Sequence, residues 1–238
     1  MPFDSWESVR RNLLKGVEKA VLLQESLEWH FNELRPEYLL TVQVADAMAD
    51  LHRREENTDS WKIYLECTTG KAINEIVAGG NLWVRSFGKA KQARKKLADD
   101  KRFRKGRIDI LAAKDAEGQT DNGCCYVVEL KGLNPTSTAI RADVERIGIL
   151  MGLADADNRL ERAFVVFAWK ATGRFTSLDK RKKDLEKSLG KTCAAYGLSM
   201  HTREHLIRTN TGPEEGTPEV YGICLAFERR PISLGSAR

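Results

Sequence analysis

Residues 106–112 read GRIDILA and residues 124–131 read CCYVVELK, and these two short runs decide the fold that we expect. Both are rich in β-branched and other apolar residues, which favours strands. The intervening residues 115–123 (DAEGQTDNG) are polar and rich in turn formers. Two apolar strands joined by such a loop predict a β-hairpin, with strands over 107–112 and 124–130. Gly132, Asn134 and Pro135 are predicted to end the second strand.

Each predicted strand carries charged residues among apolar neighbours. Asp109 lies between two isoleucines, and Glu129 and Lys131 are separated by Leu130. Side chains alternate across a strand, so Glu129 and Lys131 point to one face while Leu130 points to the other. If the strands pair as a hairpin, Asp109 lies opposite Glu129. Two carboxylates and an ammonium group would then converge.

This combination of groups suits phosphodiester hydrolysis. Mg²⁺ binds oxygen ligands and takes one or two carboxylates from a protein, here Asp109 and Glu129. A bound metal activates water and stabilises charge on a phosphate. Lys131 is suited to orient the attacking hydroxide or to stabilise developing charge. An ordinary cross-strand ion pair is the alternative, but charges on so apolar a strand are costly to bury and favour a functional site.

The segments 106–110 and 127–131, separated by a loop, resemble the motif of the PD-(D/E)XK nuclease superfamily, whose members have the restriction-endonuclease-like fold. In that fold a helix precedes a hairpin that bears the Asp and the Glu-x-Lys, and a helix and a further strand follow. The order expected here over about 36–169 is similar, although Ile108 stands where the name-giving proline would be. The resemblance implies a mixed sheet flanked by helices and a site that uses Mg²⁺, with Mn²⁺ as a substitute. The implied catalytic residues are Asp109, Glu129 and Lys131, and the implied metal ligands are Asp109, Glu129 and Leu130.

The resemblance also implies an acidic residue on a helix before the hairpin. Glu37 is the first candidate and Glu75 the second. A glutamate in the first turn of a helix is also favoured by the helix dipole, which offers a purely structural explanation for Glu37. In the helix predicted after the hairpin, Asp143 and Arg146 share one face. Arg146 is expected either to contact a phosphate or to form a surface ion pair with Asp143.

Basic residues are concentrated just before the hairpin. Between Arg85 and Arg107, eleven Lys and Arg residues oppose two Asp residues, so this segment carries +9 while the whole chain carries +5. Such a concentration suits the nucleic-acid backbone, whose phosphates basic residues neutralise. A solvated lysine-rich helix is the alternative. The residues expected to bind nucleic acid are Lys95, Lys96, Arg102, Arg104, Lys105, Arg107 and Arg146.

The rest of the chain predicts an α/β fold with a helical N-terminal portion. We divide its 238 residues into an N-terminal helical segment, 1–35, and a nuclease-like domain, 36–238. The five scattered cysteines form no CxxC pair and are expected to be buried structural thiols. The chain shows neither a long apolar run nor a secretion signal, so we expect a cytoplasmic protein. Further predicted helices span about 4–32, 36–52, 73–78, 136–153 and 178–189, and further predicted strands span 61–67, 82–85, 163–169 and 220–227.

The function expected from these features is metal-dependent cleavage of nucleic acid, DNA in the first instance. A non-catalytic nucleic-acid-binding or assembly module with the same fold is the alternative, and a protein-interaction domain with a purely structural Glu-x-Lys pair is the third. No membrane partner is expected. Oligomeric state is open from the sequence, although a two-fold homodimer would help to cut both strands of a duplex.

Overall fold

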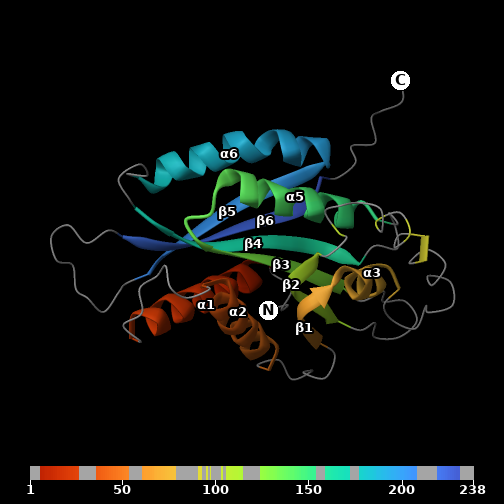
Figure 1. Cartoon of the computed structure of the whole chain (residues 1–238), viewed down its shortest axis with the longest axis horizontal. Coiled ribbons are helices and arrows are strands. Elements are labelled where there is room, and N and C mark those ends of the chain that lie inside the picture. Colours follow the sequence, from red (N-terminus) through yellow and green to blue (C-terminus); the bar gives the residue numbers. More distant parts are fainter. Residues whose placement is uncertain are drawn as a thin grey trace.

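The chain forms a six-stranded mixed sheet with helices on both faces, as seen in a computed structural model (Figure 1). The structure describes residues 6–26, 36–53, 61–78, 106–114, 124–153, 159–171, 177–207 and 219–230, together with 91, 92, 95, 97 and 103. The helices are α1 (Trp6–Ser26), α2 (Pro36–Arg53), α3 (Thr69–Ala78), α5 (Ser137–Met151) and α6 (Leu178–Ala195). The strands are β1 (Trp61–Thr68), β2 (Arg107–Lys114), β3 (Cys124–Leu133), β4 (Leu160–Lys170), β5 (Leu198–Ile207) and β6 (Val220–Arg229).

Strand order places β3 near the middle of the sheet and α5 beside it. The order is β1-β2-β3-β4-β6-β5, and all neighbouring pairs are antiparallel except β3 and β4, which are parallel. A parallel pair requires a crossover from one end of the sheet to the other. Here α5 makes that crossover and contacts both β3 and β4. Side chains of β3 on the face of the sheet that α5 covers therefore contact this helix.

The two faces of the sheet bury different side chains of β3. Figure 1 shows α1 and α2 on one face and α5 and α6 on the other. Val128 and Leu130 pack in the core on the α1–α2 side, whereas Val127 packs in the core on the α5–α6 side. This alternation follows the pleat of a strand. It directs Glu129 and Lys131 to the face opposite Leu130, as predicted, and on that face both side chains contact α5.

Helix α2 is held close to α1 at a glycine. A Cβ atom on Gly16 would lie only 2.5 Å from the Cα atom of Val44, so the two helices could not approach this closely with any larger residue. Pro36 occupies the first position of α2, where its missing amide hydrogen costs no helical hydrogen bond. The close packing fixes α2 against the sheet and places Glu37, in the first turn, beside the end of β3.

The predicted α/β class, the mixed sheet flanked by helices and the helical N-terminal portion are confirmed. The five cysteines are buried and form no disulfide, as expected. The strand expected over 82–85 and the helical residues expected over 27–32 lie outside the described residues. Among the described helices, none has the length and apolar character needed to cross a membrane.

The bounds of several predicted elements were wrong, and one strand was missed. Helix α3 begins at Thr69 rather than Ile73, and helix α6 continues to Ala195 rather than ending at Leu189. Strands β2 and β4 are also longer than predicted. Strand β3 does not end at Leu130 but continues through Gly132 to Leu133, because Leu133 still pairs with Ala168 of β4 beyond a register shift. Strand β5 was not predicted at all. Its sequence LSMHTREHLI is largely polar, and as an edge strand it pairs with β6 alone.

Candidate functional site

Asp109, Glu129 and Lys131 lie together where β2 and β3 leave their pairing. The last paired residues are Ile110 and Val128. Asp109, just before Ile110, and Glu129, just after Val128, are therefore the first residues beyond the pairing. Asp109 turns toward β3, and its Oδ2 atom accepts a hydrogen bond of 2.7 Å from the amide of Leu130. The two strands thus bring the carboxylates to one face of the sheet, as the alternation of side chains predicts.

Glu129 is almost completely buried, with 1% of its surface exposed. Its Oε2 atom lies 2.9 Å from Nη2 of Arg146, a close ion pair without the alignment of a hydrogen bond. Its Oε1 atom has no hydrogen-bond partner within the part of the chain that the structure describes. A buried carboxylate oxygen without a partner is costly, and a proton or a bound cation would relieve that cost.

Helix α5 supplies two further charged residues to this cluster. The Oδ2 atom of Asp143 lies 3.0 Å from Nζ of Lys131, and its Oδ1 atom lies 2.8 Å from Nη2 of Arg146. The predicted Asp143–Arg146 pair therefore exists, but its predicted place at the surface was wrong, because only 5% of the Asp143 side chain is exposed. Helical spacing predicts that two residues pair; it does not predict that α5 presses the pair onto β3.

Burial dominates the titration of the two carboxyl groups on the sheet. It raises the pKa of Asp109, against the opposing effects of the Leu130 amide and the Lys131 charge. It raises the pKa of Glu129 well above the ordinary value, and Arg146 offsets only part of this. Burial lowers the pKa of Lys131, but the ion pair with Asp143 and the charges of Asp109 and Glu129 outweigh it, so the net pKa is raised. Lys131 is therefore an ammonium group at neutral pH.

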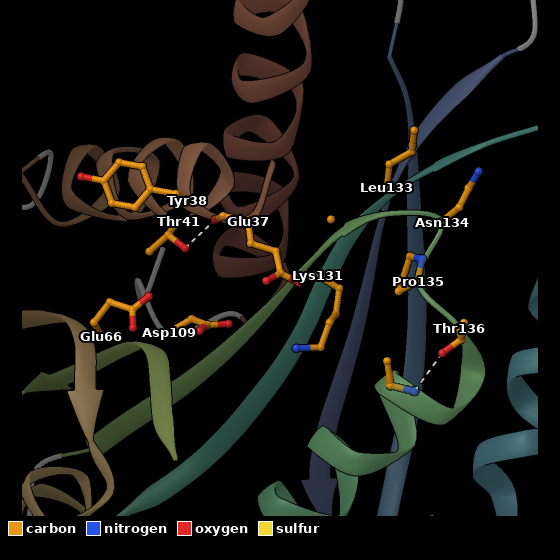
Figure 2. A pocket seen from close by; sticks show the side chains of 12 residues that line it. Glu37, Tyr38, Thr41, Glu66, Asp109, Lys131, Leu133, Asn134, Pro135 and Thr136 are labelled. Carbon is orange, nitrogen blue, oxygen red and sulfur yellow. Dashed lines mark hydrogen bonds between the residues drawn. The ribbon is translucent and has the colours of Figure 1, made fainter. Parts of the chain in front are cut away.

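A cavity of about 730 Å³ opens beside these residues, between the first turn of α2 and the end of β3. Figure 2 shows Glu37 reaching from α2 toward Lys131 and Asp109. Glu75 does not line this cavity; it lies on α3, where its carboxylate accepts a hydrogen bond of 3.2 Å from the Tyr64 hydroxyl. The structure thus brings the first candidate, Glu37, into the site and not the second. The lining residues are Glu37, Tyr38, Thr41, Glu66, Asp109, Lys131, Gly132, Leu133, Asn134, Pro135, Thr136 and Ala139.

Backbone strain is concentrated at the same cavity. Among the described residues, two non-glycine residues have positive φ, Glu66 at 49° and Asn134 at 53°, and both line it. Glu66 interrupts the pairing of β1 with β2 at the level of Asp109. The left-handed conformation is costly for a glutamate, whereas asparagine tolerates it, and costly backbone conformations cluster at functional sites. The sequence did not predict Glu66, because its alternation with Lys62 and Tyr64 resembles the solvent-facing side of an ordinary strand.

Comparison with protein-family models, with curated proteins and with solved structures finds no match for this chain. The chemistry of the site must therefore be argued from its own geometry. That geometry places three buried or half-buried carboxyl groups, those of Asp109, Glu129 and Asp143, around two cationic side chains, those of Lys131 and Arg146.

The donor set suits a magnesium ion that keeps part of its water shell. Within the described residues, no group of three or more His, Cys, Asp or Glu side chains is arranged to hold a metal ion. Mg²⁺ usually takes only one or two carboxylates from a protein, a number that Asp109 and Glu129 could supply. The unpartnered Oε1 atom of Glu129 fits the position of a cation ligand. Leu130, the third predicted ligand, can offer only its main-chain carbonyl, and its ligand role stays a prediction.

Only part of the predicted nucleic-acid-binding set falls within the described residues. Lys95 is exposed. The Arg107 side chain is 61% exposed and lies 3.7 Å from the Glu66 carboxylate, next to the cavity. Arg146 is only 18% exposed and is held by Glu129 and Asp143. Lys96, Arg102, Arg104 and Lys105 lie outside the described residues.

Proposed function

We propose that this chain is a magnesium-dependent nuclease with a restriction-endonuclease-like fold, and that DNA is its substrate. The observation that carries this proposal is the convergence of Asp109, Glu129 and Lys131 where β2 and β3 leave their pairing, with Asp109 and Lys131 lining an open cavity and Glu129 buried beside them. The order of helix, hairpin, helix and parallel strand supports the fold assignment, since it matches the order that the resemblance implies.

Asp109 and Glu129 would hold the metal. When bound, Mg²⁺ supplies Lewis-acid chemistry, activating water as a nucleophile and neutralising charge on a phosphate. The Leu130 amide fixes the Asp109 carboxylate through Oδ2, and Asp109 lines the cavity. Glu37, on the opposite wall of the cavity, supplies a further carboxylate that can accept a proton from water or bind a water of the metal.

Lys131 stabilises negative charge in this proposal rather than removing a proton. Its raised pKa keeps it positively charged at neutral pH, so it donates hydrogen bonds and cannot act as a base. Its side chain is 20% exposed and lines the cavity, whereas Glu129 beside it is almost fully buried. A phosphate that enters the cavity would therefore meet the Lys131 ammonium group, which stabilises the charge that develops as the phosphodiester bond breaks.

A non-catalytic nucleic-acid-binding module is the second candidate, and one observation favours it. Both cations of the cluster are already paired, Lys131 with Asp143 and Arg146 with Glu129 and Asp143. Cations that are already neutralised by neighbouring carboxylates could serve a structural purpose alone. Such a module would bind nucleic acid through the basic segment, with strong dependence on salt, but would need no metal.

Digestion of supercoiled plasmid separates the two candidates. Purified chain is incubated with plasmid in Mg²⁺, in Mn²⁺ or in EDTA, beside an Asp109→Asn variant. Nicking that requires a metal and is lost in the variant supports the nuclease. Equal nicking by both proteins indicates a contaminant or another site. If neither protein nicks the plasmid while both slow its migration in a gel at low salt, the result supports the non-catalytic binding module instead.

The position of Glu37 gives a further prediction. Glu37→Gln is expected to lower metal-dependent cleavage by about 10- to 100-fold, as loss of a group around a metal site typically does. Glu75→Gln is the matched control, because it removes a helical carboxylate that does not line the cavity, and it should leave cleavage unchanged. Initial rates on plasmid measure both. Equal cleavage rates for the two variants would show that Glu37 has no role in the reaction.

A further inference from the structure

One carboxylate of α5, that of Asp143, contacts both cations of the cluster. Its two oxygens bind different cations, Lys131 through Oδ2 and Arg146 through Oδ1. Arg146 in turn contacts Glu129. One side chain of α5 thus contacts both of the cations that lie near Glu129.

The burial of Asp143 argues against a chance surface contact. Only 5% of its side chain is exposed, although charged groups are rarely buried without a strong reason. The partly buried pair of Lys182 and Glu204 differs in this respect: its charged groups lie 2.9 Å apart, and the two side chains are 27% and 34% exposed. The Lys131–Asp143 pair has nearly the same length but a far more buried acid.

The neighbouring loop adds to the rigidity of α5. Thr136 caps the helix by accepting a hydrogen bond from the Ala139 amide. The side-chain amide of Asn134 bonds the main chain of Lys170 in β4 twice: its Nδ2 donates to the Lys170 carbonyl, and its Oδ1 accepts from the Lys170 amide. The buried Arg181 of α6 donates to the Pro135 carbonyl. The loop that leads into α5 is therefore attached to both β4 and α6, and these attachments restrict the movement of the helix that carries Asp143.

We propose that Asp143 is a positioning residue that holds the Lys131 ammonium group at the wall of the cavity. Without this contact, the four-carbon side chain of lysine has many conformations, and fixing it costs entropy. Asp143 restricts it in advance, so the ammonium group is in place before a substrate arrives. This role rests on the proposed function only in the part assigned to Lys131; the placement of Lys131 by Asp143 can be tested without any activity.

The test measures how readily Lys131 reacts, and it uses Lys182 as an internal reference. Trace labelling with acetic anhydride, read by mass spectrometry, compares wild type with Asp143→Asn. Labelling of Lys131 is expected to rise at least about tenfold in the variant, because a charge-assisted contact is lost, while labelling of Lys182 stays the same. Glu204→Gln is the matched control and should release Lys182 but not Lys131. Unchanged labelling of Lys131 in a folded Asp143→Asn variant would overturn the proposal.

The Asp143→Glu variant distinguishes the effect of the position of the carboxylate from the effect of its charge. It also provides a test if Asp143→Asn does not fold. It keeps the charge in the cluster but moves the carboxylate by one methylene. Misplacement by about 1 Å can cost about 100-fold in rate, so cleavage should fall by about 10- to 100-fold with KM for DNA unchanged, and Lys131 should label faster. Wild-type labelling and wild-type cleavage in Asp143→Glu would refute positioning. If the wild type does not cleave, the labelling result still decides the placement of Lys131.

Discussion

Glu129→Gln is expected to make the chain more stable at pH 8 while abolishing its metal-dependent cleavage. The cluster of Asp109, Glu129, Asp143, Lys131 and Arg146 contains three carboxyl groups and two cations, so with every group ionised it carries one net negative charge. Glutamine removes that charge from a nearly fully buried position and leaves Arg146 with its partner Asp143. Each 1 kcal/mol gained in the free energy of unfolding raises Tm by about 2–4 °C in a chain of this size. Thermal unfolding followed by circular dichroism measures the change.

The pH dependence of this gain follows from the raised pKa of Glu129. The folded chain binds a proton at Glu129 more tightly than the unfolded chain, whose pKa is near the ordinary 4.5. The contribution of the protonated group to stability is therefore complete below that value and is lost as pH rises through the higher pKa of the folded state. The variant should exceed wild type in free energy of unfolding most at high pH, and this difference in stability should vanish toward pH 4. Glu186→Gln, an exposed change on α6, should show no such trend. A Glu129→Gln variant that is less stable than wild type at pH 8 would show that the ion pair with Arg146 outweighs burial.

Lys131→Ala is expected to lower the rate of cleavage by about 100- to 1,000-fold, the range seen when one donor that stabilises developing charge is removed. The loss should appear in kcat, because the ammonium group acts on charge that develops in the transition state. Binding of Mn²⁺ and of DNA should change little, since Asp109, Glu129 and the basic segment remain. Single-turnover rates on an end-labelled duplex measure the effect.

Lys182→Ala is the matched control for this change. Lys182 is also a partly buried lysine in a close ion pair, 27% exposed and 2.9 Å from Glu204, but it lies on α6 away from the cavity. Its variant should cleave at the wild-type rate. If the cleavage rate of Lys131→Ala is within about threefold of the rate of Lys182→Ala, Lys131 has no role in charge stabilisation.

The fold was predictable where the burial of an element shows in its sequence. Strand β3 is a nearly unbroken apolar run because it lies in the interior of the sheet and is covered on both faces. Strand β5 lies at the edge, and most of its side chains are only partly buried, so its polar sequence carries no comparable signal. The extension of β3 to Leu133 depends on pairing with Ala168, a residue far along the chain that local turn signals cannot reveal.

The site was predictable to the extent that it depends on strand alternation. That rule places Glu129 and Lys131 on one face and brings Asp109 to the same end of the hairpin. Glu66 escaped prediction because it reaches the cavity through a local departure of the backbone, with φ at 49°, inside an otherwise regular strand. The burial of Asp143 escaped prediction because it depends on how α5 packs over β3, which helical periodicity does not encode.

Binding of Mn²⁺ to the purified chain tests most directly the central claim, that Asp109 and Glu129 together hold a divalent metal. Electron paramagnetic resonance distinguishes free from bound Mn²⁺ during a titration, and Mg²⁺ serves as competitor. We predict saturable binding in the wild type that Mg²⁺ displaces, that tightens as pH rises and Glu129 loses its proton, that persists in Glu75→Gln and that is lost in Asp109→Asn. Binding of equal strength in wild type and Asp109→Asn, or no saturable binding even with DNA present, would contradict the claim.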